Sequence, residues 1–194
     1  MSAVPAQSPP LGKQKVLDAA QELFAEGSYG DIGVALILEK AGVQAPTLYH
    51  HFGDKEGLFT LWAEQAFAKI EGAVTRNSGG ITTLDSLIRY SCSLLSNIEF
   101  DLHQILRDAL RLQRPESKDR VLGAYMRAVY EPLATILVEA VATSEFRNDS
   151  VQQLADVFLG GLLALRNSSL PVETMDSQAA WWCQAFIRAF AKTS

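Results

Sequence analysis

The side chains best suited to chemistry gather in residues 43–56, whose sequence is VQAPTLYHHFGDKE. Leu48 and Phe52 are four residues apart, so in a helix they lie on one face and can pack against a core. The side chains that project from the remaining surface are Thr47, Tyr49 and His50. A short helix with small, hydrogen-bonding and aromatic groups on its exposed side fits the major groove of DNA.

Catalytic chemistry finds little support elsewhere in the chain. The three histidines are His50, His51 and His103, and the first two already belong to this stretch. The sequence contains no glycine-rich phosphate loop, metal-ligand cluster or nucleophile elbow. Cys92 and Cys183 stand far apart within apolar patterns, which is typical of small buried hydrophobic residues rather than of a disulfide or a metal pair. We therefore expect neither an enzyme nor a bound metal or cofactor.

Helices must position these side chains, because apolar residues recur at helical spacing throughout and strand-type alternation never persists. We expect a first helix over residues 11–25 and a second over 34–40, which Gly42 ends. Pro46 suits the first turn of a third helix, where its missing N–H costs nothing. Asp54 is expected to cap a long fourth helix.

The clearest boundary follows at residues 77–80, Asn-Ser-Gly-Gly. Five further helices are expected beyond it, over residues 83–98, 101–112, 117–143, 150–167 and 176–191. Pro132 interrupts the third of these, because a proline within a regular helix costs about 3 kcal/mol. The pattern allows a kinked helix or two separate helices there, and also a functional hinge. The expected fold class is all-α.

The order and spacing of several blocks in the first third of the chain resemble the TetR family of regulators. The resemblance runs from Lys13 to about Phe67. Its blocks are Val16-Leu17-Asp18-Ala19-Ala20, Leu23-Phe24, Ala41-Gly42-Val43, Thr47-Leu48-Tyr49-His50-His51-Phe52 and Asp54-Lys55-Glu56. The resemblance implies a sequence-specific DNA-binding transcriptional regulator, and in particular a repressor that a small-molecule inducer releases from a palindromic operator.

The resemblance also implies how the chain is divided. Residues 1–10 contain three prolines and no charge, which favours a disordered arm. The implied parts that follow are a helix-turn-helix DNA-binding domain at 11–53, a connecting long helix at 54–78, and a ligand-binding and dimerisation domain at 79–194.

Roles in DNA binding carry over position by position. Thr47 and Tyr49 match positions that usually bond DNA phosphates, and Lys55 matches the usual phosphate-binding lysine. The recognition helix opens with Gln44, Ala45 and Pro46, where base contacts are often made. Gln44 can pair with an adenine edge, and His50 can reach a base or a phosphate. Tyr49 can instead be a packed aromatic, and His51 is expected to be structural.

The chain departs from the family pattern at several positions. Ile32 and Gly33 stand where threonine or serine is common, so the second helix loses a cap and a phosphate donor. We expect Asp31 to take over the capping role. Pro46 replaces a frequent glycine and stiffens the start of the recognition helix, and Lys13 stands where arginine is usual.

The charge of the chain argues against nucleic acid. The net charge is −5, and residues 1–78 hold six lysines and arginines against nine acidic residues. DNA binding therefore requires the cations to cluster on one face. The candidates are Lys13, Lys15, Lys40 and Lys55. A dimer then offers about eight cations, and a log–log salt slope of at most roughly −7 is expected.

The last two expected helices have the composition of a subunit interface. Small residues beside large aromatic ones let helix pairs approach closely and interdigitate. The expected interface residues are Phe158, Gly161, Leu162, Trp181, Trp182 and Phe186. Two-fold symmetric DNA needs a dimer, and the resemblance implies a four-helix interface at this place. The alternative is that these faces fill the core of one protomer.

The helices between the two ends can line a small-molecule pocket, in which aromatic walls and a few polar groups orient a ligand. The candidate residues are Tyr90, His103, Arg107, Tyr125 and Met126. Arg107 would attract an anionic ligand if it points inward, and a flexible Met126 would accommodate an apolar one. Each of them can also be an ordinary core or surface residue.

The expected partners are double-stranded operator DNA, a second copy of the chain and an unidentified small-molecule inducer. No apolar run approaches the length of a membrane span, and the N-terminus lacks a secretory signal, so we expect a cytoplasmic protein without a membrane partner. Two rival functions stay open. One is a helical ligand-binding or interaction module with a weak or vestigial DNA-binding domain, and the other is an activator in place of a repressor.

Overall fold

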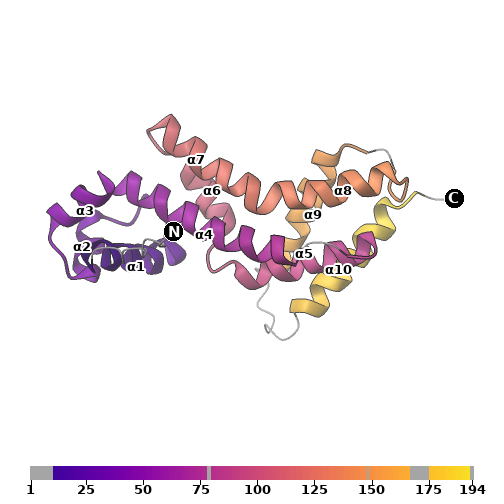
Figure 1. Cartoon of the computed structure of the whole chain (residues 1–194), viewed down its shortest axis with the longest axis horizontal. Coiled ribbons are helices and arrows are strands. Elements are labelled where there is room, and N and C mark those ends of the chain that lie inside the picture. The colour runs from indigo at the N-terminus through magenta and orange to yellow at the C-terminus, as the bar shows by residue number, and fades with distance from the viewer. Residues whose placement is uncertain (1–10, 78–79, 148, 167–174, 193–194) are drawn as a thin grey trace, which may run out of the picture. The chain divides into compact units, whose positions relative to one another are not determined.

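The computed structural model describes residues 11–77, 80–147, 149–166 and 175–192. Within them the chain is helical, and β-type pairing is limited to one isolated bridge between Phe146 and Ala191 (Figure 1). The helices are α1 Leu11–Glu26, α2 Val34–Ala41, α3 Ala45–Phe52, α4 Lys55–Arg76, α5 Thr83–Asn97, α6 Leu102–Leu110, α7 Pro115–Tyr125, η1 Met126–Tyr130, α8 Glu131–Ala142, α9 Val151–Arg166 and α10 Met175–Phe190. The all-α prediction is confirmed.

Helix ends near the N-terminus follow local signals. Gly42 ends α2 in the left-handed region with φ 61°, a conformation that favours glycine. The Asp54 carboxylate accepts the backbone N–H of Gly57 at 2.8 Å, as predicted for a cap of α4. The predicted cap of α2 was wrong: Gly33 is the N-cap residue without a side-chain bond, and the carboxylate of Asp31 accepts the Ser28 hydroxyl instead.

The long helical run from Pro115 to Ala142 contains a π-helical turn, η1, which ends two residues before Pro132. In this turn the N–H of Glu131 donates to the carbonyl of Met126, five residues earlier. The wider turn lets the run continue through a proline that would break a regular α-helix. One continuous helical run is therefore found in place of two separate helices, and the expected kink at Pro132 stays a prediction.

By length and composition, this 28-residue helical run is apolar enough to cross a membrane, although charged residues interrupt it. One such helix is a weak indication, because core helices of soluble proteins pass the same test. Leu133 and Leu137 on this run are fully buried within the protein.

The chain forms two compact units. Unit 1 comprises Met1–Ala66 and Glu99–Leu122, and unit 2 comprises Phe67–Ile98 and Gly123–Ser194. In unit 1, α1, α2 and α3 gather around the first half of α4, and α6 belongs to the same unit (Figure 1). The functional boundaries expected at residues 53 and 78 stay predictions.

Each unit has an aromatic core. In unit 1 the rings of Phe24, Phe59 and Trp62 lie 5.2–5.6 Å from one another, centroid to centroid. In unit 2 the rings of Phe158 and Phe186 meet edge to face at 5.0 Å. Edge-to-face and tilted pairs at these separations stabilise a core beyond the area that they bury.

Candidate nucleic-acid interface

The short helix α3 is fixed in unit 1 by its apolar side. Leu48 is fully buried and Phe52 nearly so, which confirms that this pair faces the core. Pro46 lies in the first turn, and Gly53 with φ 77° ends the helix. The remaining side of α3 is consequently left for other contacts.

The exposed side of α3 carries most of the residues predicted to contact DNA. Gln44, Pro46 and His50 are exposed, and Tyr49 has 51% of its surface accessible, so it is not a core aromatic. Ala45 and Thr47 are half-buried. This side therefore presents amide, phenol and imidazole groups to solvent, and these can bond phosphate oxygens and base edges.

The two histidines of α3 differ in their surroundings. Their rings meet edge to face, with centroids 4.8 Å apart. His51 is half-buried and its ring also contacts that of Phe52, whereas His50 is exposed. This is the arrangement expected of a structural His51 beside an accessible His50.

Lys55 at the start of α4 bonds within the protein. Its ammonium donates to the carbonyls of Tyr29 at 2.8 Å and Ile32 at 3.0 Å, and it lies 4.1 Å from the centroid of the Tyr29 ring. Burial lowers the pKa of Lys55, and the carboxylates of Asp108 and Asp31 act in the opposite direction. An ammonium has three donors, so two serve the turn between α1 and α2, and the predicted phosphate contact has at most the third.

The other candidate cations differ in how accessible their ammonium groups are to a phosphate. The ammonium of Lys40 lies 2.6 Å from the carboxylate of Glu22 on α1. Lys15 is exposed and Lys13 half-buried. The charge available to phosphates from these lysines is therefore smaller than their number suggests.

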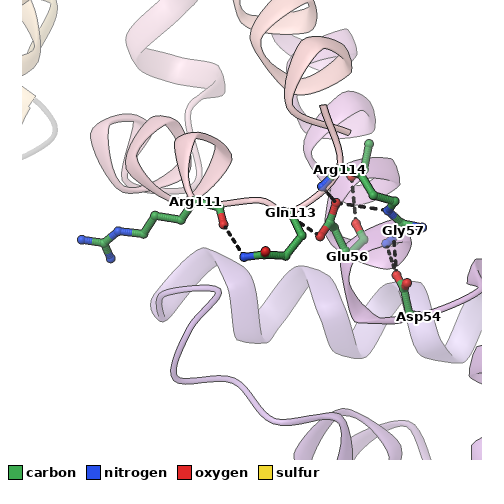
Figure 2. Close-up of polar contacts among 7 residues, drawn as sticks. Asp54, Glu56, Gly57, Arg111, Gln113 and Arg114 are labelled. Carbon is green, nitrogen blue, oxygen red and sulfur yellow. Dashed lines mark hydrogen bonds and ion pairs between the residues drawn. The ribbon is translucent and has the colours of Figure 1, made fainter. Parts of the chain in front are cut away.

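The structure also shows a polar cluster at the start of α4 that the sequence analysis missed. The carboxylate of Glu56, with 8% of its side chain exposed, accepts the backbone N–H groups of Gln113 and Arg114, each at 3.0 Å, and the Nε of Arg114 at 3.1 Å (Figure 2). Nη2 of Arg114 also donates to Asp54 at 2.7 Å. The acidic residues directly after α3 were a visible signal, but nothing in the sequence pointed to their partner.

The residues predicted to form a ligand pocket do not gather around one cavity. A cavity of about 360 Å³ in unit 2 is lined by Val74, Thr75, Ser86, Tyr90, Pro132, Thr135, Ile136 and Glu139. Of the five candidates Tyr90 lines it, and its buried hydroxyl donates to the carbonyl of Val129 at 2.8 Å. His103 and Arg107 are exposed on α6 in unit 1, and Arg107 bonds Gln104. The other two candidates are Tyr125, which is half-buried, and Met126, which is exposed.

The predicted interface residues divide between core and surface. Phe158, Leu162 and Phe186 are buried within a single chain. Trp182 is half-buried and donates from Nε1 to the Phe158 carbonyl at 3.1 Å, and Gly161 lets α9 approach it, since a Cβ there would lie 2.2 Å from the indole. Trp181 is 59% exposed. Phe158, Leu162 and Phe186 therefore fill the core of one chain, and Trp181 remains available to a partner.

Comparison with known proteins points to one family. Residues 16–60 match the family described as bacterial regulatory proteins, tetR family. The chain is 34% identical over 77 residues to the HTH-type transcriptional repressor AcnR of Corynebacterium glutamicum, over 40% of this chain and 41% of AcnR. It is 31% identical over 67 residues to the HTH-type transcriptional regulator BetI of Stenotrophomonas maltophilia, over 34% of each chain. The matched part thus spans about two fifths or less of the length of these curated relatives.

Solved structures share the fold over nearly the whole chain. The TetR family transcriptional regulator PfmR from Thermus thermophilus superposes with a TM-score of 0.71 at 21% identity, covering 89% of this chain and 97% of PfmR. A regulatory protein of the tetR family from Rhodococcus RHA1 superposes with a TM-score of 0.76 at 16% identity, covering 97% of this chain and all of that one. These likenesses show a helix-turn-helix domain followed by a helical C-terminal part.

Proposed function

We propose that this chain, whose residues 16–60 match the tetR family of bacterial regulatory proteins, is a sequence-specific DNA-binding transcriptional regulator of that family. The observation that carries the proposal is the solvent-facing side of α3. Leu48 and Phe52 anchor this helix while Tyr49 and His50 stay accessible, which suits a helix that enters the major groove. In this role Gln44 and His50 contact base edges, and Tyr49 and Thr47 contact phosphates.

The regulator acts as a repressor and as a homodimer in this proposal. AcnR is described as a repressor, which favours repression over activation. Trp181 and Val157 are exposed on α10 and α9, at 59% and 48%, and a second copy of the chain would bury them. A two-fold symmetric dimer then places two copies of α3 on a palindromic operator.

A small molecule controls this repressor in the cytoplasm. The cavity of about 360 Å³ in unit 2, with apolar walls from Val74, Pro132 and Ile136, supports such a ligand site. A ligand that binds better to a protomer shape unfit for DNA lowers operator affinity by its differential binding energy.

The test is a selection from genomic DNA of the source organism. Fragments that the purified full-length protein retains are sequenced, in parallel with Tyr49→Ala and Leu110→Ala. Leu110 is an exposed apolar residue of unit 1 on α6 and serves as the control. Enrichment of one palindrome by the wild type and Leu110→Ala, and its loss in Tyr49→Ala, is the expected result.

If no sequence is enriched even at low salt, the alternative of a helical binding module with a vestigial DNA-binding domain takes precedence. The inward bonds of Lys40 and Lys55 are the observation that favours that alternative. A reporter gene placed behind the enriched sequence distinguishes a repressor from an activator. Deletion of the gene for this protein raises reporter expression if the protein is a repressor and lowers it if the protein is an activator.

A further inference from the structure

At the corner between α3 and α4 in unit 1, the end of α3 packs directly against the first turn of α4. Gly53 and Asp54 alone separate the last residue of α3, Phe52, from the first residue of α4. A Cβ atom at Gly57 would lie 2.1 Å from the carbonyl oxygen of Phe52, so the first turn of α4 rests directly on the end of α3. The orientation of that turn therefore fixes the orientation of the helix before it.

Arg114, in the loop between α6 and α7, forms hydrogen bonds to this corner. Its guanidinium bonds Asp54 through Nη2 at 2.7 Å and Glu56 through Nε at 3.1 Å (Figure 2). The same Asp54 oxygen accepts the N–H of Gly57 at 2.8 Å, so one carboxylate joins the helix cap to the guanidinium. Charge-assisted bonds of this kind are shorter and stronger than neutral ones and have a defined geometry.

The segment that carries Arg114 also holds the turn between α1 and α2. The carboxylate of Asp108, which is buried on α6, accepts the N–H of Tyr29 at 2.8 Å. Lys55 bonds the carbonyl of the same Tyr29. Residues 108–114 thus contact both loops that flank the helix-turn-helix, within the same unit.

We propose that Arg114 is a positioning residue for DNA recognition, because its bonds to Asp54 and Glu56 hold the α3–α4 corner so that α3 presents its exposed side in one orientation. The proposal rests on the DNA binding proposed above. A recognition helix that reads base edges needs its side chains held within a fraction of an ångström and about 10–20°. Without the guanidinium, α3 samples several orientations and binds DNA more weakly.

The chain offers a matched control for this residue. Arg120 on α7 forms a bidentate ion pair with Glu64 on α4, in which Nε lies 2.9 Å from Oε1. Both residues belong to unit 1. Arg114→Ala and Arg120→Ala each remove one exposed guanidinium and one positive charge. The first loses the ion pairs with Asp54 and Glu56, and the second loses the ion pair with Glu64. Arg114→Ala keeps the backbone N–H that bonds Glu56, so the loop retains part of its attachment. Only Arg114 contacts the corner itself.

The experiment measures two properties of the full-length wild type, Arg114→Ala, Arg114→Lys and Arg120→Ala. The first is amide hydrogen exchange without DNA at residues 49–57. The second is affinity for the DNA fragment enriched from the genome. We expect Arg114→Ala to exchange about tenfold faster and to bind about tenfold more weakly, which corresponds to about 1.4 kcal/mol. Arg114→Lys should recover part of the loss, and Arg120→Ala should match the wild type.

Two results would overturn the proposal. Equal loss of affinity in Arg114→Ala and Arg120→Ala would show a general effect of charge, and unchanged exchange and affinity in Arg114→Ala would show that the corner holds without it. Wild-type protein that binds no DNA would instead refute the proposed function, and the exchange rates would then still decide whether Arg114 fixes the corner.

Discussion

The ion pairs of unit 1 predict how strongly salt weakens DNA binding. Of the four candidate lysines, Lys40 is paired with Glu22 at 2.6 Å, and Lys55 bonds two carbonyls. Lys13 and Lys15 remain, so the proposed dimer brings about four cations to phosphates in place of about eight. Each neutralised phosphate contributes about −0.9 to the log–log slope, and the expected wild-type slope is therefore about −4.

Removing one carboxylate should change that slope by a known amount. Glu22→Gln releases the ammonium of Lys40, which is already partly exposed. Two released cations in a dimer steepen the slope by about 2, to roughly −5 or −6. Glu39→Gln is the matched control, because it removes the same charge from α2 next to Lys40 and leaves the pair with Glu22 intact.

The assay is fluorescence anisotropy of a labelled fragment carrying the enriched sequence, titrated at several salt concentrations between about 50 and 200 mM. Loss of a negative charge raises the affinity for DNA in both variants. The slope distinguishes this shared gain from the release of counterions by Lys40, which is expected in Glu22→Gln alone. A wild-type slope near −7, or an unchanged slope in Glu22→Gln, would refute the assignment of Lys40 and Lys55 to internal contacts.

Three further predictions concern stability and pH, and all are measured by chemical denaturation. Gly161→Ala should lower the free energy of unfolding by about 1–3 kcal/mol, because its Cβ would lie 2.2 Å from the Trp182 ring, and an unchanged midpoint would contradict this packing. Tyr90→Phe should cost about 0.5–1.5 kcal/mol through loss of the buried hydroxyl bond to the Val129 carbonyl, and a neutral substitution would show that the π-helical turn does not need it. Burial raises the pKa of the Glu56 carboxyl, but the hydrogen bonds that it accepts outweigh burial and lower the pKa below the ordinary value. A lowered folded-state pKa stabilises the protein above the unfolded pKa, and this stability is lost as the pH falls through the folded value. Stability should therefore decline below about pH 4.3, less steeply in Glu56→Gln, and identical pH profiles would contradict the role of this carboxylate.

Features that depend on neighbouring residues could be predicted from the sequence. Gly42 ends α2 because its left-handed backbone suits glycine, and Pro46 enters the first turn of α3 because no N–H is needed there. The spacing of Leu48 and Phe52 alone predicted which side of α3 is buried. Such local rules were sufficient for the position and the exposed side of α3.

Contacts over long sequence separations could not be predicted in the same way. Glu56 and Arg114 are 58 residues apart, and no periodicity relates them. A lysine at the start of a helix gives the same pattern whether its ammonium faces a phosphate or, like Lys55, the carbonyls of a preceding turn. Arg107 illustrates the same limit, because spacing on α6 did not reveal that its side chain faces solvent.

Recognition of DNA by the exposed side of α3 is tested most directly by an NMR titration of isotope-labelled full-length protein with the enriched fragment. We expect the largest amide shift changes on residues 44–50 other than Pro46, which has no N–H, and smaller ones with a scrambled fragment of equal length and charge. Shift changes that avoid α3, or that are equal for both fragments, would contradict sequence-specific recognition by this helix.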